Sequence, residues 1–125
     1  MTREVIRTDN APKPGGQYSQ GILTDDLIFV AGSLGTDPKT NTLVAGIEAQ
    51  TRQALTNIRS ILEAAGSSLD KAVRVGVYLR DINDFQAMNK VYTTFFAKDP
   101  PARTTIQAIL AGNFLVEIDA IALRK

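Results

Sequence analysis

The clearest regular pattern in the chain is an alternation with a period of two in residues 73–80. Valine and leucine occupy the odd positions there, and Arg, Gly and Tyr occupy the even ones, which predicts a strand with one strongly apolar face. Residues 26–34 are apolar on both sides of the same alternation, which is typical of a strand covered on both faces. Two further strands are predicted at about residues 103–109 and 115–123.

Two segments have the spacing of amphipathic helices. In residues 46–65 apolar side chains recur every three or four positions, and Gly66 is well placed to end the helix. A second helix follows, with Asp81 or Asn83 as its N-terminal cap. The proline pair at 100–101 ends any continuation and imposes an extended entry into the next strand. The apolar side chains of the second helix are Phe85, Met88, Tyr92, Phe95 and Phe96.

The predicted elements follow the order β-β-β-α-β-α-β-β. A chain of 125 residues supports one hydrophobic core, so residues 1–125 are expected to form a single domain. Two helices can cover only one face of such a sheet. In the last strand, Leu115 and Ile121 lie on the face opposite Val116, Ile118, Ala120 and Ala122, so both of its faces are apolar. Because a monomer offers no third layer, we expect identical subunits to pack their sheets together. The alternative is a monomer with an exposed apolar face.

Composition removes several classes of function. The chain has no Cys and no His, which excludes disulfides, thiolate nucleophiles, imidazole bases and almost every transition-metal site. Its net charge is +1, and the scattered basic residues argue against a nucleic-acid interface. No stretch reaches the roughly 18 uncharged apolar residues of a membrane span. The N-terminal residues lack the apolar run of a signal peptide, so the cytoplasm is the expected compartment.

Arg103 and Glu117 are the strongest candidates for chemistry. Arg103 opens a strand after a rigid proline pair, where its planar guanidinium could bind a carboxylate through two hydrogen bonds. The alternative for Arg103 is a solvated charge at the rim. Glu117 lies within an apolar strand, where a carboxylate needs a partner or a proton and could orient or deprotonate water. The alternative for Glu117 is a strand with one wet face, which it shares with Asp119.

Two other polar positions are candidates for a binding site. Asn89 falls within the apolar side of the second helix, so its amide must find partners inside the fold or in a pocket wall. Residues 15–20 join a glycine-rich bend to Tyr18, whose hydroxyl both donates and accepts hydrogen bonds. This segment suits the rim of a site for a small polar ligand, and it equally suits a hairpin or a packing role.

Several segments in a fixed order resemble the RidA/YjgF family, and the similarity runs nearly end to end. The most specific part is the element Pro101-Ala102-Arg103, followed by a glutamate on the last strand, here Glu117. The matching segments are residues 16–20 (GQYSQ), 31–40 (AGSLGTDPKT), 81–85 (DINDF), 89–92 (NKVY), 101–104 (PART) and 116–118 (VEI).

The resemblance implies a chorismate-mutase-like α+β fold, with a mixed sheet and two helices packed on one face. It also implies a homotrimer with three sites in clefts between subunits. Arg103 would bind the substrate carboxylate, and Glu117 would position the attacking water. The other residues implied to line or support the cleft are Tyr18, Gly32, Asn89 and Thr105, the last mainly through its backbone N–H.

The implied reaction is hydrolytic deamination of enamines and imines of small 2-amino acids, such as 2-aminoacrylate, to 2-keto acids and ammonia. It requires no metal and no organic cofactor. The chain differs from the best-studied branch of the family at four places. Thr105 stands where Cys is usual, Ala31 where Ser is usual and Gln17 where Pro is usual. Residues 110–113 replace a Leu-Pro turn. These differences bear on substrate preference and rate. Two alternatives remain: a regulatory trimer that binds a small carboxylate without turnover, and a ribonuclease or translation inhibitor.

Overall fold

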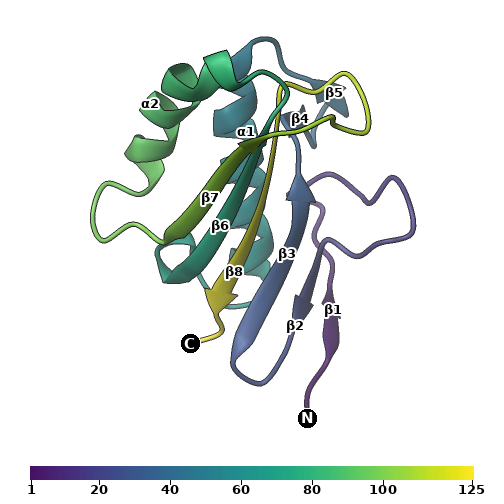
Figure 1. The fold of residues 1–125 in the computed structure, drawn as a ribbon. Coiled ribbons are helices and arrows are strands. Elements are labelled where there is room, and N and C mark those ends of the chain that lie inside the picture. The colour runs from purple at the N-terminus through teal and green to yellow at the C-terminus, as the bar shows by residue number, and fades with distance from the viewer.

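A six-stranded mixed sheet forms the frame of the protein, in the order β1-β2-β3-β8-β6-β7 (Figure 1). The computed structural model describes residues 1–125. Neighbouring strands are antiparallel except β6 and β7, which are parallel and need a crossover connection. Helix α2 (Phe85–Phe95) supplies that crossover. The strands of the sheet are β1 (Glu4–Ile6), β2 (Gly21–Leu23), β3 (Leu27–Ser33), β6 (Ala72–Leu79), β7 (Ala102–Gln107) and β8 (Val116–Leu123).

Both long helices lie on the same face of this sheet (Figure 1). Helix α1 (Ile47–Ala64) packs on the two central strands β3 and β8. It buries Leu55, Ile58 and Leu62 completely, which are positions that its helical spacing predicts to be apolar. Gly66, with a φ of 81°, follows the helix, and the prediction that this glycine ends α1 is confirmed. The hydrophobic core therefore lies between the helices and one face of the sheet.

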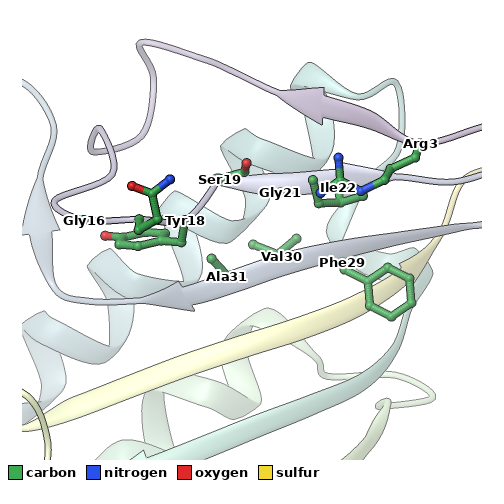
Figure 2. Close-up of a pocket in the computed structure, with 10 residues that line it drawn as sticks. Arg3, Gly16, Tyr18, Ser19, Gly21, Ile22, Phe29, Val30 and Ala31 are labelled. Atoms are coloured by element: carbon green, nitrogen blue, oxygen red, sulfur yellow. The ribbon is translucent and has the colours of Figure 1, made fainter.

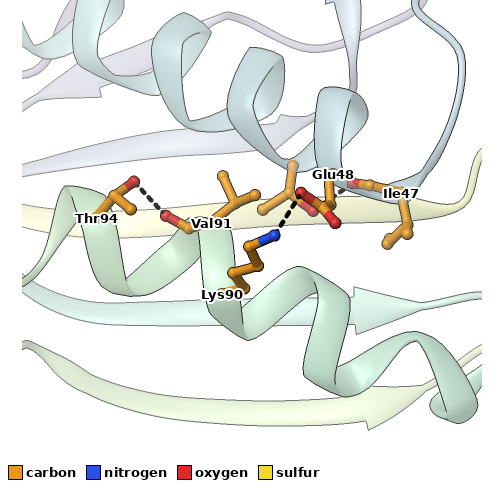
Figure 3. Close-up of polar contacts among 6 residues, drawn as sticks. Ile47, Glu48, Lys90, Val91 and Thr94 are labelled. Atoms are coloured by element: carbon orange, nitrogen blue, oxygen red, sulfur yellow. Dashed lines mark hydrogen bonds and ion pairs between the residues drawn. The ribbon is translucent and has the colours of Figure 1, made fainter.

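The two helices also meet each other at their exposed sides. Lys90 of α2 and Glu48 of α1 form an ion pair of 3.6 Å between Nζ and Oε1 (Figure 3). Both side chains are exposed, so this pair contributes little to stability. Before α2, a 3-10 turn (Ile82–Asp84) is capped by Asp81, whose Oδ1 accepts a hydrogen bond of 2.9 Å from the N–H of Asn83. Asp81 therefore caps this turn, whereas the N-cap of α2 itself is Asp84, which makes no side-chain capping hydrogen bond, so the prediction that Asp81 or Asn83 caps the second helix is wrong.

Two short strands are additional to the predicted order. β4 (Thr36–Asp37) and β5 (Thr42–Leu43) form a separate two-stranded sheet, and the loop between them contains Asn41 at a φ of 57°. Strands of two residues are too short to show a period, so only the turn between them is predictable. Strand β7 ends at residue 107, two residues before its predicted end. The rest of the order, and the α+β class, are confirmed.

The second face of the sheet has no covering layer within the chain. Phe29, Ile106 and Leu123 lie on three different strands and expose 43%, 45% and 43% of their surface. The prediction that residues 26–34 are covered on both faces is therefore not met within one chain. Apolar patches of this kind are typical of surfaces that bind another chain. No helix of the structure has the length and apolar character that crossing a membrane requires.

Candidate functional site

Arg103 lies on the edge strand β7, and its side chain points to the helix-covered face. Its neighbour across the β6–β7 pair is Val75, which is buried in the core. The Nη1 atom of Arg103 donates a hydrogen bond of 2.8 Å to Oδ1 of Asn89 on α2. The guanidinium carbon lies 4.5 Å from the ring centroid of Tyr92 and 5.5 Å from that of Phe85. Two aromatic rings and an amide therefore hold this charge in place.

Two buried hydroxyls on this side of the sheet have no hydrogen-bond partner. They are Oη of Tyr92 and Oγ1 of Thr105, and no other buried side-chain nitrogen or oxygen in the chain is unpaired. Thr105 follows Arg103 by two residues on the same side of β7. Unpaired buried polar groups in native proteins need an explanation, such as a ligand or a bound water. We define the Arg103 cluster by its five members, Phe85, Asn89, Tyr92, Arg103 and Thr105.

The Tyr92 phenol remains protonated beside the guanidinium. Burial raises the pKa of Tyr92, and the positive charge of Arg103 acts in the opposite direction. Because burial is the larger effect, the hydroxyl keeps its proton at neutral pH and can donate a hydrogen bond. The Arg103 cluster thus offers a cation and two hydroxyl groups to an anionic ligand.

Glu117 lies on β8 with its side chain on the uncovered face, opposite Tyr78 of β6. A Cβ atom on Gly32 of β3 would lie 2.5 Å from Oε2 of Glu117, so only a glycine leaves room for this carboxylate. Burial raises the pKa of Glu117, and the negative charge of Asp119 raises it further. A carboxylate in these surroundings is more basic than an ordinary glutamate.

Tyr18 belongs to the loop between β1 and β2, and it is 53% exposed. Its hydroxyl oxygen accepts a hydrogen bond of 3.0 Å from the N–H of Gly15. Together with Gly32, Tyr18 lines a cavity of about 190 Å³. A larger groove of about 540 Å³ runs from Tyr18 along β2 and β3, past Ala31 to Phe29 (Figure 2). We define the Glu117 cluster as Tyr18, Gly32 and Glu117.

The loop that carries Tyr18 is fastened by the buried side chain of Gln20. Its Nε2 atom lies within hydrogen-bond distance of the carbonyl oxygens of Thr8, Ala11 and Pro12, at 3.0, 3.2 and 2.9 Å. Its Oε1 atom accepts a hydrogen bond of 2.8 Å from the N–H of Thr8. Gln20 has no sequence signal of its own, because one glutamine in a polar segment shows no pattern. The helical spacing of Phe85 and Tyr92 likewise predicts only a place in the helix core.

The structure brings the predicted site residues together in two groups rather than one. Arg103, Asn89 and Thr105 belong to the helix-covered side of the sheet, whereas the Glu117 cluster lies on the uncovered side. Strand β6 also separates β7 from β8, which adds two strand spacings of about 4.8 Å each. Arg103 and Glu117 of the same chain therefore do not face a common ligand.

The chemistry available to the two groups follows from their functional groups. The Arg103 cluster can bind a carboxylate, and the Glu117 cluster offers a carboxylate of raised basicity. No group of three or more Asp, Glu, His or Cys side chains is close enough to hold a metal ion. Fold and site together define a class of α+β protein whose mixed sheet carries, on its edge strand, an arginine held by an amide and two aromatic rings.

Comparison with known proteins identifies the family. The family model described as Endoribonuclease L-PSP matches residues 8–124. A RutC family protein of Pyrococcus horikoshii is 50% identical over 125 residues, which cover 98% of this chain and 99% of the relative. The goat protein named 2-iminobutanoate/2-iminopropanoate deaminase is 44% identical over 126 residues, covering 99% of this chain and 92% of the relative. The chain belongs to the RidA/YjgF family.

Solved structures agree with this assignment. The crystal structure of RidA from an Antarctic Psychrobacter has a TM-score of 0.94 and 38% identity, and the match covers 97% of this chain and 99% of that one. The crystal structure of E. coli TdcF with bound serine has a TM-score of 0.94 and 33% identity, covering 98% and 99% of the two chains. The chorismate-mutase-like arrangement of two helices on a mixed sheet is thus shared with these two solved structures.

Proposed function

We propose that this protein is a 2-iminobutanoate/2-iminopropanoate deaminase, which hydrolyses enamines and imines of small 2-amino acids to 2-keto acids and ammonia. The observation that carries the proposal is the Arg103 cluster. Its guanidinium is held by Asn89 and two aromatic rings and faces no carboxylate of the chain, so it is free to bind the carboxylate of a ligand. The name of the goat relative supports this reaction, and the serine bound to TdcF supports a ligand of this size.

The proposed reaction needs few catalytic groups. An enamine such as 2-aminoacrylate tautomerises to an imine, whose carbon is already electrophilic. Arg103 binds the carboxylate and thereby fixes the position of that carbon. Glu117 accepts a proton from water as the water oxygen bonds to the carbon, and it passes this proton to the nitrogen, whose double bond to carbon becomes single, to give a carbinolamine. It then takes the proton of the new hydroxyl and delivers it to the nitrogen as the C=O bond forms and the C–N bond breaks. The products are a 2-keto acid and ammonia, and no metal or organic cofactor takes part.

We further propose that the protein acts as a homotrimer with its sites between subunits. The Arg103 cluster and the Glu117 cluster lie on opposite faces of one sheet, so a neighbouring chain has to bring one to the other. The uncovered apolar face offers the surface for this contact. In the resulting cleft, Tyr18 and Gly32 line the wall beside Glu117, and Thr105 offers its backbone N–H beside Arg103.

A coupled assay tests the proposal. A serine dehydratase releases 2-aminoacrylate in the cuvette, and the formation of pyruvate is compared with and without this protein. We expect the wild type to accelerate hydrolysis, Arg103→Ala to abolish the acceleration and Arg103→Lys to restore only part of it, because Lys lacks the planar fork. Arg52→Ala, on the exposed side of α1, is the matched control. Full activity of Arg103→Ala would refute the clamp.

A binding module is the second candidate, because the Arg103 cluster is complete as an anion clamp without any base. Calorimetric binding of 2-oxobutanoate, combined with no acceleration of imine hydrolysis, would favour this function over the enzyme. The description of the matched family also names a ribonuclease activity. The net charge of +1 and the lack of His argue against that activity in this chain, and an RNA cleavage assay tests it directly.

A further inference from the structure

On the uncovered face, the carboxylate of Asp119 is held by two donors from β6. Its Oδ1 atom accepts a hydrogen bond of 3.1 Å from the N–H of Gly76, and its Oδ2 atom accepts one of 3.0 Å from the hydroxyl of Tyr78. Asp119 lies two residues from Glu117 on the same side of β8, so the two side chains stand about 7 Å apart along the strand. We propose that Asp119 is a positioning residue of the candidate site, a fixed negative charge that makes Glu117 a better proton acceptor.

The place for this carboxylate exists because residue 76 is a glycine. A Cβ atom there would lie 2.5 Å from Oδ1 of Asp119 and 2.8 Å from the hydroxyl oxygen of Tyr78. Glycine weakens the interior of a strand, and in such a position it commonly marks a close approach of other atoms. The backbone of β6 thus leaves the space that the Asp119 carboxylate occupies between its two hydrogen-bond donors.

The arginines Arg74 and Arg80 form no ion pair with Asp119, although Arg74 is close enough to act against the raised pKa of Tyr78. From β6, Arg74 lies at 3.4 Å from the hydroxyl of Thr104, and Arg80 donates to Oδ1 of Asn113 at 3.0 Å. Strands β3 and β7 contribute no charged side chain to this face, since Arg103 points to the other one. The remaining titratable group is the phenol of Tyr78, which stays neutral because burial and Asp119 raise its pKa.

The effect on Glu117 follows from the repulsion between two neighbouring carboxylates. Ionising Glu117 next to a fixed negative charge is unfavourable, so its proton affinity rises. The raised pKa of Glu117, due first to burial and then to Asp119, agrees with this arrangement. Asp119 takes no part in proton transfer itself, because its two oxygens are occupied by Gly76 and Tyr78. This inference rests on the proposed function only where it gives Glu117 the role of a base.

The decisive experiment is the titration of the Glu117 carboxyl carbon by NMR in the full-length protein. We expect Asp119→Asn to move the midpoint of Glu117 to lower pH, because the amide keeps the shape but removes the charge. Tyr78→Phe is the matched control, since it removes one hydrogen bond but leaves the charge of Asp119, and its Glu117 midpoint should stay above that of Asp119→Asn. An unchanged midpoint in Asp119→Asn would overturn the inference. Asp119→Ser replaces this variant if the asparagine does not fold.

Kinetics then separate this inference from the proposed function. In the coupled assay, Asp119→Asn should move the acidic limb of the kcat/KM profile to lower pH, together with the NMR midpoint. If the NMR titration midpoint of Glu117 shifts but the acidic limb of the kcat/KM profile does not, the positioning role is overturned, because Glu117 is then not the group whose ionisation limits the rate. If the wild type shows no imine hydrolysis, the proposed function fails, and the NMR titration still decides whether Asp119 acts on Glu117.

Discussion

The hydrogen bond from Nη1 of Arg103 to Oδ1 of Asn89, at 2.8 Å, joins the edge strand β7 to helix α2. No carboxylate neutralises this guanidinium, because the single ion pair of the chain is formed by Lys90 and Glu48. A half-buried cation without a counter-charge is costly. The groups that hold this one are a neutral amide and two aromatic rings. The arrangement orients the charge, and we propose that its remaining donors bind the carboxylate of the ligand.

Removal of the amide tests this orientation. Asn89→Ala deletes the hydrogen bond to a charged group, which is worth about 1.5–3 kcal/mol, so we expect the KM of the imine to rise by roughly tenfold or more. The kcat should change little, because the interaction contributes to binding rather than to the chemical step. Steady-state kinetics measure both constants, with Lys90→Ala as the neighbouring control. A large fall in kcat at constant KM would contradict this role.

The ring of Tyr92 also contacts this guanidinium, with its centroid 4.5 Å from the guanidinium carbon. Tyr92→Leu removes a cation–π contact worth about 0.5–2 kcal/mol, so we expect weaker binding of 2-oxobutanoate by isothermal titration calorimetry. Tyr92→Phe keeps the ring, and the difference between the two variants isolates its contribution. If Tyr92→Phe binds as weakly as Tyr92→Leu, then the unpaired hydroxyl contacts the ligand and the ring is not what matters.

Gly32 leaves the space that the Glu117 carboxylate occupies. Gly32→Ala would place a Cβ atom 2.5 Å from Oε2, so Glu117 must rotate away and we expect imine hydrolysis to fall by about tenfold to a hundredfold, as for a misplaced catalytic group. Gly15→Ala is the control, because its nearest contact is the hydroxyl of Tyr18 at 4.0 Å. A Gly32→Ala variant with wild-type kcat would show that the position of this carboxylate is not critical.

Much of the fold is predictable because its long elements have a clear period. Helix α1 and strand β6 repeat their apolar positions over several turns or pleats, so their type and their buried side follow from spacing alone. The two-residue strands β4 and β5 have no period to detect. The sequence pattern of β3 predicts cover on both faces, yet its second face has no covering layer within the chain. The prediction fails because periodicity shows which surface is apolar and does not show what covers it.

The candidate residues were found by type, whereas their grouping required the structure. A strand pattern shows that Glu117 and Asp119 share one side of β8. It does not show that Arg103 lies on the opposite side of the sheet, because this depends on the register of β7 against β6. The contact between Arg103 and Asn89 depends in turn on how α2 packs on β7. Long-range pairing of this kind leaves no local signal.

The raised pKa of Glu117 also predicts how stability depends on pH. Its folded-state pKa lies above the unfolded value, so its ionisation opposes folding, and stability falls as pH rises from the unfolded pKa through the folded one. Glu117→Gln cannot ionise, and we expect its Tm to exceed that of the wild type at neutral pH. This gain should disappear below a pH of about 4, where the wild-type carboxyl is protonated. A lower Tm at neutral pH would show that the ionised carboxylate is stabilised, contrary to this reasoning.

Mixing two inactive variants tests whether neighbouring chains build one site. Arg103→Ala retains Glu117 and Glu117→Gln retains Arg103, so a site that takes one group from each chain can be intact only in a mixed oligomer. After joint unfolding and refolding of equal amounts, about a quarter of the sites of a randomly mixed trimer should carry both groups, and activity should return to about that fraction of the wild type. Each variant refolded alone is the control and should remain inactive. If the mixture is no more active than its components, then both groups act within one chain or do not act together, and the proposed site between subunits is wrong.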